Sequence, residues 1–286
     1  MNDNFACFIL TYGRPKSINT LRSLKNSGYE GKTYLLCSDD DKKLEEYKQL
    51  HENVIVFNKK EMFGTFDKMD NFGSEKCVVY ARNKCFDLAK DLGIDYFCML
   101  DDDYTKFSYS EDNNGSYIGN KKIKNINKIF EYMVEFIKNT TAKTICFAQG
   151  GDFIGGDSCS VWKHILKRKA MNLYVFKTDR PVKFIGTINE DTNMYTCFGS
   201  VGELFFTTRM LRLEQKQTQS NNGGLTDIYL ESGTYVKSFY TIMTNPSSVE
   251  VRLMGEKNSR LHHFIKWKNT VPCILSEEVK YGKRKI

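Results

Sequence analysis

The stretch from Phe97 to Phe107, FCMLDDDYTKF, places three consecutive carboxylates directly after a run of apolar residues. The apolar run is typical of a buried strand, and Asp101, Asp102 and Asp103 follow where that strand should end. Carboxylates a few ångströms apart repel each other unless a cation or a shared proton offsets their charge. The cluster therefore indicates a metal site at the end of a buried strand. An acidic turn on the surface is the simpler alternative for so short a pattern.

The residues before this cluster alternate between short apolar runs and segments with helical spacing of apolar residues. Such alternation predicts an α/β fold with a mostly parallel sheet and helices on both faces. In open sheets of this kind, ligands bind beyond the carboxyl ends of the strands, where the aspartates fall. The expected strands are 5–10, 32–38, 53–58 and 95–100, and the expected helices are 15–27, 41–50 and 74–92.

The second half of the chain continues the same mixture of elements without a repeat or a low-complexity linker. One continuous domain, 1–286, is therefore expected. A glycine-rich stretch, 149–158, lets backbone approach a ligand closely, or is simply a flexible turn after a strand. The expected elements are a helix at 122–138, strands at 144–148, from Asn172 and at 202–208, a polar loop around 189–191, and a loop at 214–224.

The composition of the chain limits which classes of protein it can belong to. The chain has 286 residues, of which 41% are hydrophobic and 13% aromatic, enough for a sizeable core. It has no apolar run of about 18 residues and no signal-peptide pattern, which favours a cytoplasmic protein without a membrane span. The nine cysteines are scattered and form no CxxC pair, so the sequence indicates neither a structural zinc site nor a disulfide framework. The net charge of +7 fits either a solvated lysine-rich surface or a surface that faces a polyanion.

The motif MLDDDYT also resembles the Asp-x-Asp-x-Thr motif of haloacid-dehalogenase-like phosphatases, in which Asp101 would be the nucleophile. Glu190 and Asp191 would then provide the later acidic motif of that superfamily. In those enzymes the first motif normally lies on an early strand. Here a long series of strands and helices precedes it, so the phosphatase remains the second alternative.

Three segments taken together, FILTYGRP, LLCSDDD and VVYARNKCFDLAKDLGIDYFCMLDDD, resemble the nucleotide-sugar half of a GT-A glycosyltransferase of the family-2-like type. The resemblance implies a single GT-A-like, Rossmann-type domain, with donor binding in 1–107 and acceptor binding plus a tail in 108–286. It also implies a nucleotide-sugar donor, expected to be a UDP-sugar, and Mn²⁺ or Mg²⁺ under its diphosphate. The implied donor-binding residues are Thr11, Tyr12, Arg14, Asp39, Arg82, Asn83, Asp101 and Asp102, and the implied metal ligands are Asp101 and Asp103.

The same resemblance implies a catalytic acidic pair further along the chain, which Glu190 and Asp191 match. Asp191 is the candidate base for an inverting transfer, although acidic residues are also favoured at any helix N-terminus. The usual acceptor-side Gln/Arg-x-x-Arg-Trp motif is absent. Many GT-A enzymes take a third metal ligand from a late histidine, which makes His262 a candidate, and a surface pair with His263 is the alternative.

Within GT-A enzymes, the chain is most similar in general pattern to the phage-encoded TET-associated glycosyltransferases. That similarity implies transfer to a 5-hydroxymethylpyrimidine in double-stranded DNA, and so a nucleic-acid partner. The basic residues expected to contact this acceptor are Lys163, Lys167, Arg168 and Lys169. A catalytically silent binding module, which would keep this fold but lack metal-dependent donor binding, is a third alternative.

Overall fold

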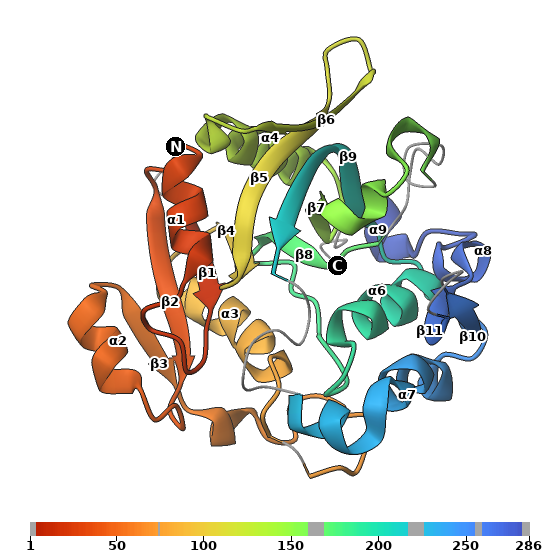
Figure 1. Ribbon diagram of the computed structural model, residues 1–286, viewed down its shortest axis with the longest axis horizontal. Helices are drawn as coiled ribbons and strands as arrows, with labels where there is room; N and C mark the ends of the chain where they lie inside the picture. Colours follow the sequence, from red (N-terminus) through yellow and green to blue (C-terminus); the bar gives the residue numbers. More distant parts are fainter. Residues whose placement is uncertain (1–3, 74, 160–168, 217–225, 255–258, 282–286) are drawn as a thin grey trace.

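The computed structural model describes residues 4–73, 75–159, 169–216, 226–254 and 259–281 (Figure 1). In these residues, nine strands form one sheet in the order β3-β2-β1-β4-β8-β7-β9-β5-β6, and β10 pairs with β11 in a separate hairpin. The strands are β1 (Phe5–Leu10), β2 (Lys32–Ser38), β3 (Val54–Phe57), β4 (Tyr96–Asp101), β5 (Tyr104–Glu111), β6 (Tyr117–Lys122), β7 (Thr144–Gln149), β8 (Asn172–Lys177), β9 (Phe205–Gln215), β10 (Val249–Met254) and β11 (Arg260–Ile265).

The strand directions confirm a mostly parallel sheet. Strand β1 is parallel to β2 and β4, β2 is parallel to β3, and β7 is parallel to β9. Strand β8 runs antiparallel to its neighbours β4 and β7, and β5 runs antiparallel to β9 and β6. Within the described sheet, therefore, β5 and β8 run against the direction of the other strands.

Helices cover both faces of this sheet. On one face, Leu24 of α1 and Phe130 of α4 belong to one apolar core, and on the other, Phe86 of α3 and Met194 of α6 belong to a second core. The helix bounds are α1 (Asn19–Asn26), α2 (Leu44–Leu50), α3 (Val79–Asp91), α4 (Ile126–Asn139), α6 (Glu190–Ser200), α7 (Thr226–Thr244), α8 (Trp267–Thr270) and α9 (Glu277–Tyr281), with 3-10 turns η1 (Lys59–Met62), η2 (Gly150–Phe153) and η3 (Gly156–Ser158).

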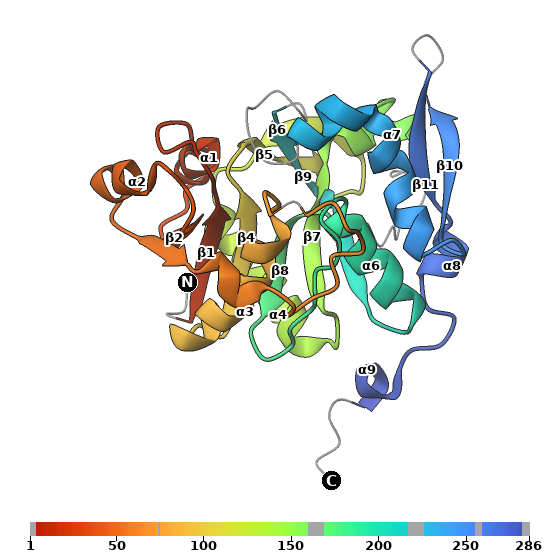
Figure 2. The ribbon, with the colours of Figure 1, turned by 90° about the horizontal axis from the view of Figure 1, so that it is seen from below.

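The far end of the molecule from α2 is formed by α6, α7 and the β10–β11 hairpin, which lie side by side (Figure 2). No helix in the described part of the chain has the length and apolar character needed to cross a membrane.

The central strands are buried on both faces, and alternate side chains enter opposite cores because successive residues of a strand point to opposite sides. In β4, Cys98 and Leu100 pack with α1 and α4, whereas Phe97 and Met99 pack with α3 and α6. This alternation decides where the acidic cluster at the end of β4 projects. Asp101 continues the Phe97 and Met99 side.

The prediction of a polar loop around 189–191 is wrong beyond Asn189, because α6 begins at Glu190. Strands β5 and β6 directly after the acidic cluster were also not predicted. They add an antiparallel hairpin to the edge of the sheet next to β9. The first strand β1 and the second strand β2 have the predicted bounds.

Candidate active site

Two neighbouring aspartates of the cluster turn to opposite faces of the sheet. Asp102 is 3% exposed and accepts a hydrogen bond of 2.8 Å from the Thr11 hydroxyl. Its other carboxylate oxygen lies 3.3 Å from a guanidinium nitrogen of Arg14. Asp101 faces α3 instead, where Arg82 meets it at 3.1 Å. The cluster therefore divides its charge between the loop after β1 and the helix α3.

The Arg82 side chain joins the end of β4 to the start of α6. Its Nη2 lies 3.1 Å from Asp101, and its Nε donates a hydrogen bond of 2.8 Å to Glu190. The guanidinium carbon lies 5.5 Å from the ring centre of Tyr174 and 5.7 Å from that of Phe184. Because Arg82 is only 3% exposed, its charge is available to these two carboxylates far more than to water. The Asp-x-Asp motif and the Glu190-Asp191 pair thus belong to one site.

The acidic pair occupies the first turn of α6, next to the positive end of the helix dipole. Glu190 is buried, whereas Asp191 is half-buried and accepts a hydrogen bond of 2.6 Å from the backbone of Thr192. Burial raises the pKa of Glu190, and the nearby Arg82 guanidinium opposes that rise. Burial also raises the pKa of Asp191, opposed by Arg82 and Lys237. Both carboxyls are therefore more basic than an exposed carboxyl.

The loop after β1 is fixed by groups that follow β2 and lie in α2. The Gly13 amide donates a hydrogen bond of 2.6 Å to Asp41, and the Arg14 amide donates one of 2.8 Å to the hydroxyl of Tyr47. The Tyr47 hydroxyl, which is fully buried, also shares a hydrogen bond of 2.8 Å with Thr11. This network holds the predicted donor loop next to the acidic run that follows β2, of which Asp39 was the predicted member.

Tyr12 and Asp39 lie at this junction, where each contacts Lys59. The Lys59 ammonium lies 5.6 Å from the centre of the Tyr12 ring and 2.6 Å from the carboxylate of Asp40. The exposed Asp39 accepts a hydrogen bond of 3.1 Å from the Lys59 backbone. An aromatic ring and an exposed carboxylate that both contact the same lysine suit a planar, hydrogen-bonding ring such as a nucleobase.

A cavity of about 350 Å³ opens beside this loop. It lies between this loop and the start of α2, across which Lys16 and Glu46 pair at 2.8 Å. The residues that line it are Gly13, Arg14, Pro15, Lys16, Ser17, Lys43 and Glu46.

Asn83 faces the backbone of Phe184. Its side-chain amide donates a hydrogen bond of 2.9 Å to the Phe184 carbonyl and accepts one of 2.9 Å from the Phe184 amide. Both ends of the amide are thus engaged in holding the segment that leads to α6. A direct donor contact by Asn83 stays a prediction.

The metal site was predicted at Asp101, Asp103 and His262. Burial, followed by the charges of Asp101 and Asp102, raises the pKa of Asp103 to about 7. A divalent cation would relieve this repulsion, and carboxylate oxygens are ligands that Mn²⁺ and Mg²⁺ accept. Asp101 and Asp103, both half-buried, therefore fit such an ion. Among the described residues, no three His, Cys, Asp or Glu side chains are arranged to hold a metal ion, so His262 does not join the two aspartates.

His262 lies on β11, where its ring stacks on that of His263 at 4.4 Å between centroids. Burial, and then the charges of Arg260 and Lys237, lower the pKa of His262. The ring is therefore neutral at neutral pH, in surroundings that are positively charged.

Most of the predicted acceptor-binding segment, with Lys163, Lys167 and Arg168, lies outside the described residues. Lys169 is described, and its ammonium lies 2.8 Å from the carboxylate of Asp152, in the 3-10 turn after β7. The acceptor role of all four residues stays a prediction.

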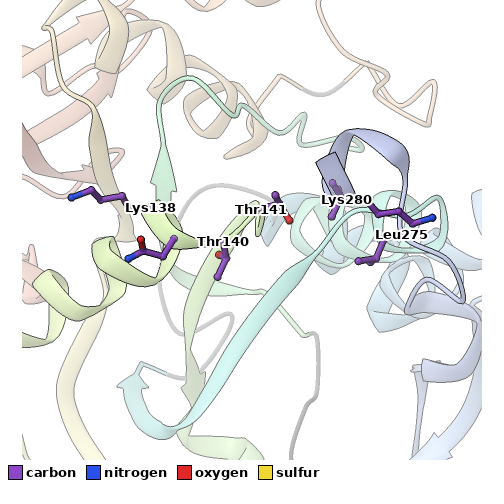
Figure 3. Close-up of a pocket in the computed structure, with 7 residues that line it drawn as sticks. Lys138, Thr140, Thr141, Leu275 and Lys280 are labelled. Carbon is purple, nitrogen blue, oxygen red and sulfur yellow. The ribbon is translucent and has the colours of Figure 1, made fainter. Parts of the chain in front are cut away.

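A second cavity, of about 640 Å³, lies where the end of α4 meets the C-terminal segment. Figure 3 shows Lys138, Thr140 and Thr141 on one side and Leu275 and Lys280 on the other. The site residues named above do not line it.

Several residues that build the site were not selected from the sequence: Asp41, Tyr47, Lys59, Tyr174 and Phe184. Asp41 is part of a visible acidic run, so its spacing from Asp39 was a usable signal. The aromatic residues look like ordinary core residues, and only the tertiary structure places them beside polar groups.

Comparison with known proteins identifies the family to which the chain belongs. A family model described as TET-Associated Glycosyltransferase matches residues 5–224, and no curated protein matches the chain. Among solved structures, the chain is similar to glucosyl-3-phosphoglycerate synthase from Mycobacterium tuberculosis, determined in complex with Mg²⁺ and uridine diphosphate. The TM-score is 0.46 with 9% identity, over 91% of this chain and 87% of that chain. The family match spans every described strand from β1 to β9, and the chain therefore belongs to the TET-associated glycosyltransferase family and is a glycosyltransferase.

Proposed function

We propose that the protein transfers a sugar from a nucleotide sugar, expected to be a UDP-sugar, to a hydroxyl group with inversion at the anomeric carbon. The observation that carries the proposal is the Arg82 bridge, which joins Asp101 of the candidate metal motif to Glu190 of the candidate catalytic pair. Transfer needs a site for the leaving diphosphate beside a base for the acceptor. The buried Arg82 guanidinium contacts both motifs, which supports placing the diphosphate site beside the base.

The donor would lie along the carboxyl edge of β1, β2 and β4. Tyr12 and Asp39, which both contact Lys59, would hold the nucleobase, and Arg14, which pairs with Asp102, would contact the diphosphate. A bound Mn²⁺ or Mg²⁺ at Asp101 and Asp103 would supply positive charge for the departing nucleoside diphosphate.

Asp191 is the better candidate for the base. Glu190 is buried and uses its carboxylate on Arg82, whereas Asp191 is half-buried. A base must reach the acceptor hydroxyl, and its pKa should lie nearer the working pH than that of an exposed carboxyl. The raised pKa of Asp191 meets the second condition. Attack from the side of the base, opposite the leaving diphosphate, inverts the anomeric carbon.

The proposed acceptor is a 5-hydroxymethylpyrimidine in double-stranded DNA. Membership of the TET-associated family and the net charge of +7 support this choice. A polyanionic acceptor gains affinity from a basic protein, most strongly at low salt.

Donor binding can be tested by titrating UDP calorimetrically with Mn²⁺, with Mg²⁺ and with excess EDTA. We expect UDP binding to require the metal and Asp103→Asn to weaken it at least tenfold, since one ligand is lost. Asp179→Asn, on the exposed loop after β8, is the matched control. Equal UDP affinity in EDTA would show that the metal assignment is wrong.

The base can be tested with Asp191→Asn in a transfer assay with UDP-sugars and DNA that contains 5-hydroxymethylcytosine. Loss of a positioned base typically lowers the rate about 10² to 10⁴-fold. UDP affinity should stay within a few-fold, because the base contacts the acceptor. Undiminished turnover would exclude Asp191, and a wild type that binds the donor but transfers no sugar would favour a binding protein.

A further inference from the structure

The candidate base Asp191 lies between two asparagines that are both connected to α7. Asn189 directly precedes α6, and Asn193 follows four positions later, within α6. The side-chain amide of Asn189 donates hydrogen bonds of 2.8 Å to the carbonyl of Lys237 and of 3.3 Å to the hydroxyl of Thr241. The Thr241 hydroxyl in turn donates one of 2.7 Å to the side-chain oxygen of Asn193. One side chain of α7 therefore joins both ends of the turn that carries Asp191.

Asn189 differs from an ordinary residue at the start of a helix. Such a residue usually has an extended backbone, and its side chain accepts a hydrogen bond from an amide of the first turn. Asn189 instead has a left-handed backbone, with φ 55° and ψ 36°, and its side chain makes no bond of that kind. This conformation is uncommon outside glycine, although asparagine adopts it more readily than most residues. The Asn189 side chain is thus used on α7 and not on its own helix.

Asn193 extends the same network back along the chain. Its side-chain amide donates hydrogen bonds of 2.9 Å to the carbonyl of Ile188 and of 3.0 Å to that of Ile185. The Asn193 side chain is fully buried, and both ends of its amide are engaged. Buried polar groups that lose their partners are costly. The segment that leads into α6 is therefore held in the arrangement that satisfies these bonds.

The neighbouring residue of α7 holds this segment from another side. The Tyr240 hydroxyl accepts a hydrogen bond of 3.0 Å from the amide of Thr187 and donates one of 2.6 Å to the carbonyl of Lys68. Lys68 lies in the connection between η1 and α3. Helix α7 is thus attached to a second part of the molecule besides α6, so it can act as a support for the start of α6.

We propose that Asn189 and Thr241 are positioning residues for sugar transfer, which fix the first turn of α6 on α7 and thereby orient Asp191 toward the acceptor hydroxyl. This inference rests on the proposed function, because it takes Asp191 to be the base. Both side chains are buried among protein groups, so neither would contact the donor, the acceptor or the metal ion. Their effect on the rate would come through Asp191, and a displacement of about 1 Å can lower a rate about 100-fold.

The test uses Asn189→Gly and Thr241→Val in the full chain. Glycine adopts the left-handed backbone without strain, so Asn189→Gly removes the side-chain contacts alone. Thr241→Val keeps the shape of the side chain and removes the hydroxyl. Thr196→Val is the matched control, because the buried Thr196 hydroxyl bonds to carbonyls of its own helix, those of Thr192 and Asn193. Thermal unfolding verifies that each variant is folded at the assay temperature, and either variant suffices if the other fails to fold.

The assay measures kcat and KM for transfer to a duplex with 5-hydroxymethylcytosine, with UDP-glucose, UDP-galactose or UDP-N-acetylglucosamine as the donor. Calorimetry measures UDP affinity with Mn²⁺. We expect each variant to lower kcat about 10- to 100-fold, with the KM for the duplex and the UDP affinity within about twofold of wild type. Combined with Asp191→Asn, neither variant should lower the residual rate further, because a residue that acts through the base then has nothing to position.

Three results would overturn the proposal. The first is a kcat equal to that of Thr196→Val. The second is a further loss of the same size in the Asp191→Asn background, which a general loosening of the structure would produce. The third is weakened UDP binding, which would assign the two residues to the donor site. Undiminished turnover of Asp191→Asn alone would show that the proposed base is wrong and the inference with it, so failure of the proposed function is recognised without either variant.

Discussion

Removing the charge of Arg82 should destabilise the fold strongly, and the structure indicates how much. Arg82→Met keeps much of the side-chain volume but leaves Asp101 and Glu190 without their shared cation. Breaking a buried ion pair by removing one partner costs about 3–5 kcal/mol. The Asp101 side chain is 27% exposed and can regain water, whereas that of Glu190 is 9% exposed and cannot. We therefore expect the free energy of unfolding to fall by about 3 kcal/mol, near the lower end of this range.

Urea unfolding of the metal-free protein measures this loss, with Arg22→Met, on the exposed side of α1, as the control. The double variant Arg82→Met, Glu190→Gln should recover part of the loss, because it removes the stranded charge. Protonation of Glu190 should likewise reduce the loss of stability in Arg82→Met. Burial already raises the pKa of Glu190, and removal of Arg82 raises it further, so the loss is full above that pKa and shrinks as the pH falls through it.

Two results would refute this reasoning. A loss below about 1 kcal/mol would be the size of an exposed ion pair and would mean that water replaces Arg82. A double variant no more stable than Arg82→Met would mean that the stranded Glu190 charge is not the cause.

Three further predictions concern single side chains. Because the pKa of Asp103 is about 7, this carboxyl must release a proton to bind a cation. The affinity for Mn²⁺ with UDP should therefore fall up to about tenfold per pH unit below pH 7 and level off above it. Calorimetry at several pH values measures this affinity, and a flat profile would contradict the prediction. Tyr47→Phe removes the hydroxyl that holds Thr11, and we expect UDP affinity to fall about three- to tenfold through loss of about 1 kcal/mol of hydrogen bonding, with unchanged affinity as the contrary result. Asn83→Ala should cost about 2 kcal/mol in urea unfolding because the amide and carbonyl of Phe184 lose their partners, and a loss no larger than that of an exposed Asn→Ala control would show that the pairing is unimportant.

The parallel half of the sheet could be predicted because its strands are continuous apolar runs with clear ends. The strands β1 and β2 have the expected bounds, and β4 differs from its expected range by one residue at each end. The start of α6 could not be found in this way. Its sequence, EDTNMYTCFGS, buries polar residues such as Asn193 and Thr196, so it shows no apolar stripe.

The candidate site was predictable where it follows strand ends. The residues after β1, β2 and β4 meet because parallel strands end at one edge, and hydrogen bonds connect them. The roles of individual side chains could not be predicted in this way. Nothing in the sequence distinguishes Arg82, which connects two motifs, from Asn83, whose amide holds a backbone segment, because both roles depend on partners far along the chain.

The contacts that complete the site join distant parts of the chain, and this has a consequence for how the protein is made. Arg82 and Glu190 are 108 positions apart, Asn83 and Phe184 are 101 apart, and Thr11 and Asp102 are 91 apart. A ribosome that has finished residues 1–107 has made Arg82 and Asp101 but has still to add Glu190, the second carboxylate that pairs with Arg82. Closing such long loops is slow compared with forming local helices. The candidate catalytic pair, Glu190 and Asp191, is therefore synthesised after all of the candidate donor-binding residues, and a nascent chain carries those residues before it carries the candidate base.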